Sequence, residues 1–373
     1  MVQLEISSES VKILLVGDTG VGKTSLIYSL VNDEFEPKPP AKMADVTIPA
    51  EATPEKVPLC IIDYSPREQD EDELKESIRN SHVICLVYTM GNDKSLERVS
   101  SYWMPLIRGY QTASSIKTNQ PTAYKPIILV ASKTDLADEG KSLDKVTTVI
   151  HKFVEIEAFI EVSALIQRNI VELFSSAQKA VVYPLAPLLD PHQRILTDEC
   201  RDALIKIFKL CDLDGDGLLS DHEMNLFQEN CFGTPLQRDA LDDLKSIIKQ
   251  STVNGIQEDS ITQTGFLFIH TLSIDKGRHD FTWQVLRKFD YDNGTSGKVV
   301  HVCEDEFEPD FTEEIQVIGK DDTSAEKATD SDPSWTREHS KLIGTGLGLT
   351  LATILSIVAL RYLIQGSLKS PPS

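Results

Sequence analysis

The fold of the first half of this chain is decided by the stretch Val11-Lys12-Ile13-Leu14-Leu15-Val16-Gly17-Asp18-Thr19-Gly20-Val21-Gly22-Lys23-Thr24. Its first six residues are mostly apolar and predict a buried strand, and the apolar residues after Thr24 recur at helical spacing. Between them lies the pattern G-x-x-x-x-G-K-[ST] of a phosphate-binding loop. Strand, glycine-rich loop and helix in this order predict a cradle of backbone N–H groups for the phosphates of a nucleoside triphosphate.

The loop supplies most of the expected nucleotide contacts. Lys23 is expected to reach the β- and γ-phosphates, and the Thr24 hydroxyl is expected to bind Mg²⁺. The alternative is a chance glycine-rich turn, which the flanking strand and helix make the poorer interpretation. The nucleotide-binding residues predicted from this loop are Gly20, Val21, Gly22, Lys23, Thr24 and Ser25.

Composition bounds the class of protein. The 373 residues suffice for about two or three domains. A net charge of −21 argues against a nucleic-acid partner, which needs a basic face. Six cysteines without a C-x-x-C pair predict reduced thiols in a cytosol-facing protein. The polar, acidic Met1–Ser10 has no character of a signal peptide.

Residues 8–183 alternate apolar strands with helical segments. Near-continuous apolar strands between helices predict an α/β fold whose mostly parallel sheet is covered on both faces. The predicted strands are Val11–Val16, Leu59–Asp63, Val83–Tyr88, Ile127–Ala131 and Phe159–Val162. The predicted helices include Glu71–Asn80, Asp93–Tyr102 and Ile170–Val181.

Four further segments follow this α/β domain. Residues 184–196 contain three prolines and predict a linker, and residues 197–292 have helical periodicity that predicts an all-α domain. Residues 293–336 are acidic and aperiodic, which predicts a disordered tether. Residues 342–364 carry no charge up to position 360 and are long enough to cross a bilayer as one C-terminal transmembrane helix. A buried core helix is the alternative, but it would normally show a polar face.

Residues after two later strands indicate which base the site reads. The Asp135 carboxylate can accept hydrogen bonds from guanine N1–H and its amino group, a donor pair that adenine lacks, and the Lys133 stem can cover the base. Ser163 and Ala164 follow the next strand and resemble the S-A-K element of small GTPases, which implies that the Ala164 N–H contacts guanine O6. Both elements lie at carboxyl ends of strands, where such sheets bind ligands.

A second motif, Asp212-Leu213-Asp214-Gly215-Asp216-Gly217-Leu218-Leu219-Ser220-Asp221-His222-Glu223, fits the twelve-residue EF-hand loop. Its predicted Ca²⁺ ligands are Asp212, Asp214, Asp216, the Leu218 carbonyl and a bidentate Glu223. The alternative is a solvated acidic turn. Because EF-hands pair, residues 253–262 are interpreted as a degenerate second hand that binds no metal.

Residues 10–183 resemble the Ras/Rho-type small GTPase domain. The resemblance adds Thr47 and Asp63 to Thr24 as the Mg²⁺ set and Ser65 to the GTP-binding set. Pro66 stands where that family has Gly and Arg67 where it has the water-orienting Gln, so the resemblance implies slow GTP hydrolysis. No catalytic residue is assigned. Ser132 and Leu165 stand where the family has Asn and Lys.

Through residue 292 the order of domains resembles the mitochondrial Rho GTPases, the Miro family. The resemblance rests on Ile13–Gly17, Val46–Ala50, Asp63–Ser65, Gly265–Phe268 and residues 277–287. It implies GTP/GDP, Mg²⁺ and Ca²⁺ as ligands, and a tail anchor in the mitochondrial outer membrane with a cytosolic N-terminus. It also implies coupling of mitochondria to microtubule motors through adaptor proteins. The family usually carries a second EF-hand pair and a second GTPase domain, in whose place this sequence has the acidic stretch. A shortened form is expected, and the alternatives are a divergent paralogue and an imperfect gene model.

Three functions stay open on the sequence. The first is a GTP-hydrolysing switch with a Ca²⁺ sensor, and the second is a scaffold that binds GTP with negligible hydrolysis. A phosphate-loop ATPase or kinase is the third, disfavoured by Asp135 and by Ser163 with Ala164. An endoplasmic-reticulum anchor is the alternative to the mitochondrial one.

Overall fold

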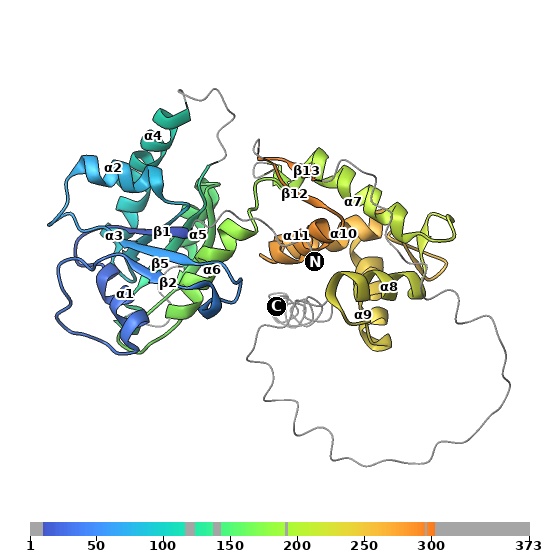
Figure 1. Ribbon diagram of the computed structural model, residues 1–373, viewed down its shortest axis with the longest axis horizontal. Helices are drawn as coiled ribbons and strands as arrows, with labels where there is room; N and C mark the ends of the chain where they lie inside the picture. The colour runs from blue at the N-terminus through green and yellow to red at the C-terminus, as the bar shows by residue number, and fades with distance from the viewer. Residues whose placement is uncertain (1–9, 116–123, 137–142, 191–192, 295–296, 303–373) are drawn as a thin grey trace, which may run out of the picture. The chain divides into compact units, whose positions relative to one another are not determined.

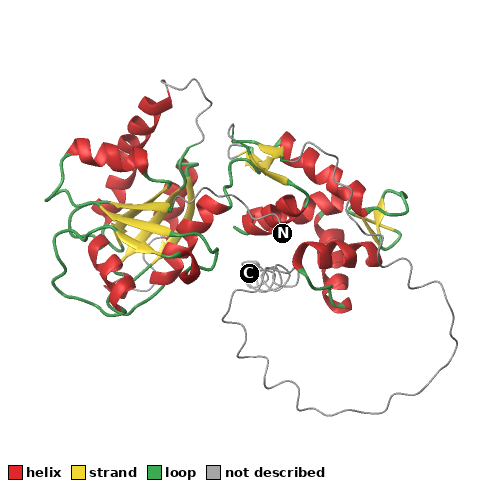
Figure 2. Cartoon of the chain, viewed as in Figure 1, coloured by secondary structure: helices red, strands yellow, loops and turns green. Residues whose placement is uncertain are grey.

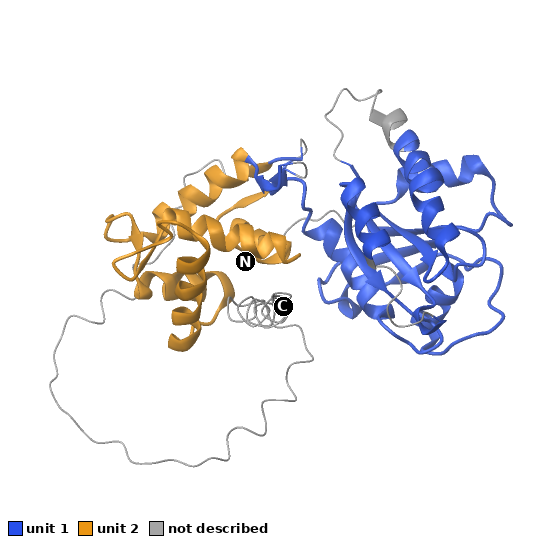
Figure 3. Ribbon diagram, turned by 180° about the vertical axis from the view of Figure 1, so that it is seen from behind, with its two compact units in different colours: residues 1–197, 294–298 blue, residues 198–293, 299–373 orange. Residues whose placement is uncertain are grey.

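The computed structural model describes residues 10–115, 124–136, 143–190, 193–294 and 297–302. These residues fall into two compact units, which Figure 3 colours separately. The first comprises the chain up to Thr197 together with Gly294–Lys298, and the second comprises the remainder. Each unit is described by itself.

The first unit is built on a six-stranded sheet with the strand order β2-β3-β1-β4-β5-β6 (Figure 1). Every neighbouring pair is parallel except β2 with β3. The central strand β1 pairs on both sides, with Ile13 opposite Ile61 on β3 and Val83 on β4. The strands are β1 (Val11–Val16), β2 (Val46–Ile48), β3 (Leu59–Asp63), β4 (Val83–Thr89), β5 (Ile127–Ser132) and β6 (Ile156–Glu161).

Helices cover both faces of this sheet because β1 is apolar on both faces. Ile13 and Leu15 belong to the core shared with α1 and α6, and Leu14 and Val16 belong to the core shared with α2 to α5. A π-helical turn, η2, joins α3 to α4. The helices are α1 (Lys23–Asn32), α2 (Glu71–Asn80), α3 (Asp93–Arg98), η2 (Val99–Trp103), α4 (Met104–Ser115), α5 (Leu143–Lys152) and α6 (Ile170–Val182), with short 3₁₀ turns η1 (Ala50–Ala52) and η3 (Thr134–Leu136).

The α/β fold predicted for this part of the chain is confirmed, and four of its predicted strands are matched to within one residue. The predicted linker 184–196 is more ordered than expected. Within it, β7 (Leu189–Asp190) pairs antiparallel with β8 (Ile195–Leu196). Leu188 and Leu189 are buried there, so apolar packing orders a segment that its prolines alone would leave extended.

The second unit is mostly helical and contains short two- and three-residue strands (Figure 2). Its helices are α7 (Asp198–Cys211), α8 (Asp221–Phe232), α9 (Arg238–Ser251), α10 (Gln263–Asp275) and α11 (His279–Lys288). Its strands are β9 (Leu218–Leu219), β10 (Ile256–Gln257), β11 (Ser260–Thr262), β12 (Tyr291–Asn293) and β13 (Val299–His301).

Two helix–loop–helix motifs pair in this unit. The strands β9 and β11, one from each loop, run antiparallel and place Leu219 opposite Ile261. Beneath them Phe266 contacts Phe208 and Phe227 edge to face, with ring centroids 5.7 and 5.4 Å apart. In this structure residues 253–262 thus pair with the loop of the first hand.

The disordered tether was predicted to begin at residue 293, but ordered structure continues beyond that position. Residues that it includes form the hairpin β12–β13, in which Asn293 pairs with Val299 and Val299 is 5 % exposed. Hairpin pairing and burial of one valine order this stretch, which its acidic composition does not reveal. The rest of the tether, 303–336, and the segment 342–364 lie outside the described residues. Among the residues that are described, no helix is long and apolar enough to cross a membrane.

Candidate functional site

The loop between β1 and α1 needs its glycines. Gly17 has φ +143°, and a Cβ atom there would lie 2.1 Å from the Val87 carbonyl oxygen of β4. Gly20 and Gly22 also have positive φ, +81° and +103°. Side chains at these positions would strain the backbone. The loop therefore passes over the sheet in a conformation that only this glycine pattern adopts without strain.

Lys23 lies inside the loop as a buried ammonium. Its Nζ donates to the carbonyl oxygens of Gly17 at 2.8 Å and Asp18 at 3.1 Å, and the residue is 6 % exposed. Burial lowers the Lys23 pKa to about 8, although the charges of Asp63 and Asp18 raise it. An anion bound in the loop would favour the charged ammonium. The position suits a phosphate.

Thr24 and Asp63 form the metal end of the site. The Thr24 hydroxyl donates to Asp63 Oδ2 at 2.9 Å, and the Met43 N–H donates to the same oxygen at 3.0 Å. The other carboxylate oxygen, Asp63 Oδ1, is buried and has no hydrogen-bond partner in the described part of the chain. A hydroxyl beside an unsatisfied carboxylate oxygen fits Mg²⁺, which prefers oxygen ligands. Mg²⁺ held there by Thr24 and Asp63 would offset the charge of the phosphates.

Thr47 does not join this pair. It is exposed on β2, where it pairs with Cys60 of β3. Cys60 precedes Asp63 by three residues, which is about 10 Å along an extended strand. In this structure strand pairing places Thr47 opposite Cys60, and the Met43 N–H contacts the Asp63 carboxylate; binding of the metal by Thr47 stays a prediction.

The base end gathers residues that follow β5 and β6. Ser163 donates a hydrogen bond to Asp135 Oδ1, and this contact orients the carboxylate predicted to read guanine. Lys133, in a left-handed conformation with φ +58°, places its Nζ 2.7 Å from the Gly20 carbonyl oxygen. The Ser132 hydroxyl lies 2.5 Å from the carbonyl oxygen of Val21 in the phosphate loop. Ser132, which stands where the Ras/Rho-type domain has Asn, thus braces the phosphate loop.

A cavity of about 750 Å³ connects the two ends. Of the predicted residues, Gly20, Gly22, Lys23, Thr24, Ser25, Ser65, Lys133, Asp135 and Ala164 line it. Val21 is buried in the core, and Ser163 acts through Asp135. Pro66, Arg67 and Leu165 also line the cavity. Sequence reasoning missed Phe35, Pro37, Pro39, Pro40 and Ala41, which lie between α1 and β2 without any periodic signal.

The acidic loop between α7 and α8 brings three predicted ligands together. The carboxylate oxygens of Asp212, Asp214 and Asp216 lie within 4.8 Å of one another. The backbone shapes the cluster, because Asp212 accepts hydrogen bonds from the N–H groups of Gly215 and Gly217, both at 2.9 Å. The three carboxylates fit the oxygen ligands of Ca²⁺.

Glu223 lies at the N-terminus of α8. Its carboxylate accepts from the Ser220 N–H and hydroxyl and from the Leu213 N–H, at 2.8, 2.7 and 2.8 Å. Burial alone would raise the Glu223 pKa, but these hydrogen bonds outweigh burial and lower it. Glu223 is thus held ionised beside the loop and is not part of the three-aspartate group. The Leu218 N–H donates to Asp216 Oδ1 at 2.7 Å, so this predicted residue also belongs to the loop.

Lys245 occupies the second hand. Its Nζ lies 2.5 Å from Asp221 Oδ1 in the first hand and 3.0 Å from Asp259 Oδ2 in the turn between β10 and β11. The side chain is 7 % exposed. An ammonium thus joins the two hands, and the absence of metal binding in the second hand stays a prediction.

Residues 12–183 match the sequence model of the Ras family. This stretch contains the six-stranded sheet, the phosphate loop, Asp63 and both base-end elements. A Ras-family domain implies binding of GTP or GDP with Mg²⁺, which agrees with the phosphate loop, the Thr24–Asp63 pair and Asp135. Residues 234–303 match a second model, described as EF hand associated. The match extends through β13 of the β12–β13 hairpin, a strand that the sequence had assigned to the tether.

Proposed function

We propose that this chain is a guanine-nucleotide switch that also senses Ca²⁺ and is tethered to the mitochondrial outer membrane. The proposal combines the Ras-family match with the geometry of one cavity. At one end lie Lys23, Thr24 and Asp63, and at the other lies Asp135 bound to Ser163. The guanine assignment rests on the Ser163–Asp135 contact. This contact orients the Asp135 carboxylate to accept from the N1–H and amino group of guanine, two donors that adenine does not present together. Nucleotide exchange tests it: GTP should displace bound GDP from the purified chain, and ATP should not.

We further propose that hydrolysis is slow. Pro66 and Arg67 line the cavity, and Pro66 lacks the N–H that a glycine would offer to the γ-phosphate. Gln69 lies close by, but its Oε1 accepts from the Ser65 N–H at 3.3 Å. The local chemistry therefore supports binding more strongly than turnover.

The second candidate is a GTP-binding scaffold, which the same two residues favour. Single-turnover hydrolysis separates the two functions. Release of phosphate from prebound GTP on a scale of minutes to hours supports a switch. Protein that keeps its GTP intact over a day supports the scaffold. The Arg67→Gln variant serves as the matched comparison, since it supplies a side chain able to orient water.

The Ca²⁺ part of the proposal rests on the three aspartates and Glu223. Ca²⁺ that binds the folded protein should raise the melting temperature of the second unit by mass action. Glu223→Gln should abolish that rise, because it removes the charged bidentate ligand and keeps an acceptor for the α8 N-terminus. His222→Gln, at an exposed non-ligand position of the same loop, is the control. Equal Ca²⁺ responses of the unmodified chain and Glu223→Gln would contradict the assignment.

The membrane and transport parts rest on the sequence alone. Residues 342–364 have the length and apolarity of a single bilayer span, and the Miro resemblance supports a mitochondrial destination and motor-adaptor partners. Imaging a tagged chain with and without residues 337–373, beside mitochondrial and endoplasmic-reticulum markers, tests both. A truncated chain that stays on mitochondria would contradict the tail anchor.

A further inference from the structure

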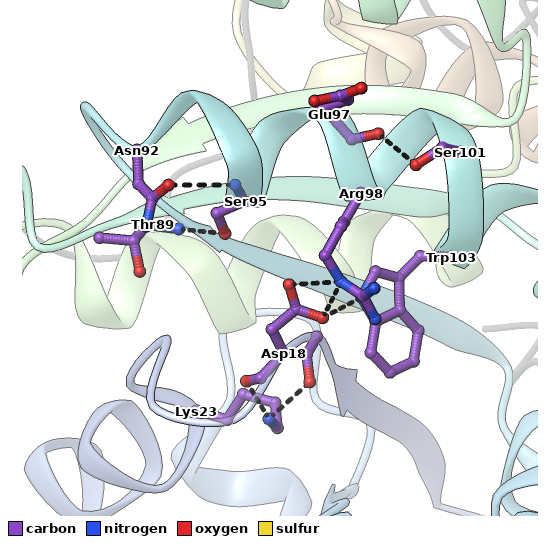
Figure 4. Close-up of polar contacts among 10 residues, drawn as sticks. Asp18, Lys23, Thr89, Asn92, Ser95, Glu97, Arg98, Ser101 and Trp103 are labelled. Carbon is purple, nitrogen blue, oxygen red and sulfur yellow. Dashed lines mark hydrogen bonds and ion pairs between the residues drawn. The ribbon is translucent and has the colours of Figure 1, made fainter.

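The side chain of Asp18, inside the phosphate loop, is held from outside the loop. Arg98 Nε lies 2.8 Å from Asp18 Oδ1 and 2.9 Å from Oδ2, and Trp103 Nε1 donates to Oδ1 at 3.0 Å. Figure 4 shows the carboxylate turned toward these two side chains. Asp18 and its partners are 80 and 85 residues apart, so no local sequence requirement explains the contact.

Arg98 and Trp103 are placed by the junction of α3 and η2. Arg98 ends α3 and Trp103 ends the π-helical turn that follows. The Arg98 guanidinium also stacks on Tyr102, 4.6 Å from the ring centroid, and Trp103 is 4 % exposed. π-Helical turns are rare in proteins, and those that occur are often found at functional sites. Here the turn lets two donors from separate helical turns reach one carboxylate.

The backbone of Asp18 performs a second task. Its carbonyl oxygen, like that of Gly17, accepts from Lys23 Nζ, and Figure 4 shows both contacts of Asp18 in one view. The residue that helps to position the phosphate-binding ammonium thus carries a carboxylate of its own. A free carboxylate beside a triphosphate repels it and competes for Lys23. Arg98 offsets that charge, and Arg98 with Trp103 directs it away from Lys23.

We propose that Arg98 and Trp103 are positioning residues that keep the phosphate loop competent for a triphosphate by neutralising and turning away Asp18. The proposal rests on the guanine-nucleotide function above and extends it to residues outside the loop. Neither residue lines the cavity, so both act through Asp18. A merely structural role for the same contacts predicts loss of stability without a charge-dependent effect on nucleotide.

The test measures dissociation of a fluorescent GTP and a fluorescent GDP from the full chain, chased with excess unlabelled nucleotide. Arg98→Ala should release GTP about five- to tenfold faster, and GDP by less, because the triphosphate carries more charge. The difference from the unmodified chain should shrink when salt is raised from low to high ionic strength. Arg98→Lys, which keeps the charge but loses the Nε–H that faces both carboxylate oxygens, should recover part of the retention.

Two further variants separate charge from packing. Asp18→Asn removes the carboxylate, so Arg98→Ala added to Asp18→Asn should have little further effect on GTP release. Arg108→Ala is the matched control. Arg108 also pairs with a carboxylate, Glu155, and lies over a ring, 4.8 Å from the centroid of Phe153, but lines no part of the cavity. It should leave GTP release unchanged.

Each outcome decides between the possibilities. Faster GTP release in Arg98→Ala that Asp18→Asn suppresses supports the proposal. Equal release rates in Arg98→Ala and the unmodified chain overturn it, as does an equal acceleration in Arg108→Ala. A double variant that releases GTP as fast as Arg98→Ala alone points to a structural role and also overturns it. An unmodified chain that does not prefer GTP to ATP overturns the proposed function itself.

Discussion

Single residues in the phosphate loop are constrained by backbone conformation and by burial. Gly17 combines φ +143° with a Cβ position 2.1 Å from a carbonyl oxygen of β4, so its replacement meets both strain and a backbone clash. Lys23 and Asp63 are nearly inaccessible, at 6 and 1 % exposure, which makes each sensitive to the charge of its neighbours. The loss of stability expected on substitution therefore differs from one position of the loop to the next.

Gly17→Ala therefore should destabilise the first unit by about 2 kcal/mol or more. Gly109 is the matched control, because it lies within α4, where an added Cβ would meet no neighbouring element within 4 Å among the described residues. Gly109→Ala should stabilise the same unit by about 0.5–1 kcal/mol, since alanine is the better helix former. Denaturant unfolding of the two variants measures both effects. Equal free energies of unfolding for Gly17→Ala and the unmodified chain would contradict the loop geometry.

Elements differ in how far the sequence reveals them. β1 and β3 follow from apolar runs between loop residues, and their bounds agree with prediction because both strands lie largely buried inside the sheet. The predicted helix Asp93–Tyr102 is in fact α3 followed by a π-helical turn, a change of hydrogen bonding that periodicity does not distinguish. The hairpins β7–β8 and β12–β13 depend on pairing between strands of two or three residues, too short for any pattern.

The residues of the nucleotide site also differ in how far the sequence reveals them. The phosphate-loop motif and the stretch Ser132-Lys133-Thr134-Asp135 are each continuous in sequence, so the sequence locates Lys23 and Asp135. The pairing of Thr47 with Cys60 was not predicted, because the sequence does not specify where the long connection between α1 and β2 enters the sheet. The link from Asp18 to Arg98 joins residues 80 positions apart, and no local pattern predicts it.

The packing of α11 on α10 makes the second unit sensitive to acid. His270 of α10 is fully buried, 4.9 Å from the ring of Phe266 and 5.3 Å from that of Phe281, and its Nδ1 lies 3.2 Å from Thr282 Oγ1. Burial lowers the His270 pKa to about 3. Below its ordinary value of 6.5, the unfolded chain binds a proton that the folded chain does not.

The free energy of unfolding should therefore fall as pH falls from 6.5 toward 3, by about 1.4 kcal/mol per pH unit from this residue. The variant His270→Phe with Thr282→Val keeps an aromatic ring and removes the titrating group together with its polar partner. It should lose that share of the pH dependence, measured by denaturant unfolding at about pH 7, 6 and 5. The same slope in the variant and the unmodified chain would refute the assignment to His270.

At the scale of the whole molecule, two units carry two kinds of ligand chemistry. The first places a buried cation, a carboxylate with an unsatisfied oxygen and an oriented Asp135 around one cavity. The second gathers three carboxylates in a loop that a β-ribbon joins to its partner hand. The Ras-family and EF-hand-associated matches cover these two parts separately.

The most direct measurement of the central claim is displacement of bound fluorescent GDP by a competing nucleotide. The competitors are GTP, ATP and xanthosine triphosphate, and the proteins are the unmodified chain, Asp135→Ala and Asp135→Asn. The unmodified chain should prefer GTP to ATP by at least about 100-fold, because adenine leaves the Asp135 carboxylate unpaired. Asp135→Ala should lose that preference. Asp135→Asn should move it toward xanthosine triphosphate, whose carbonyl accepts from the new amide. Equal displacement by ATP and GTP in the unmodified chain would contradict the guanine-nucleotide function.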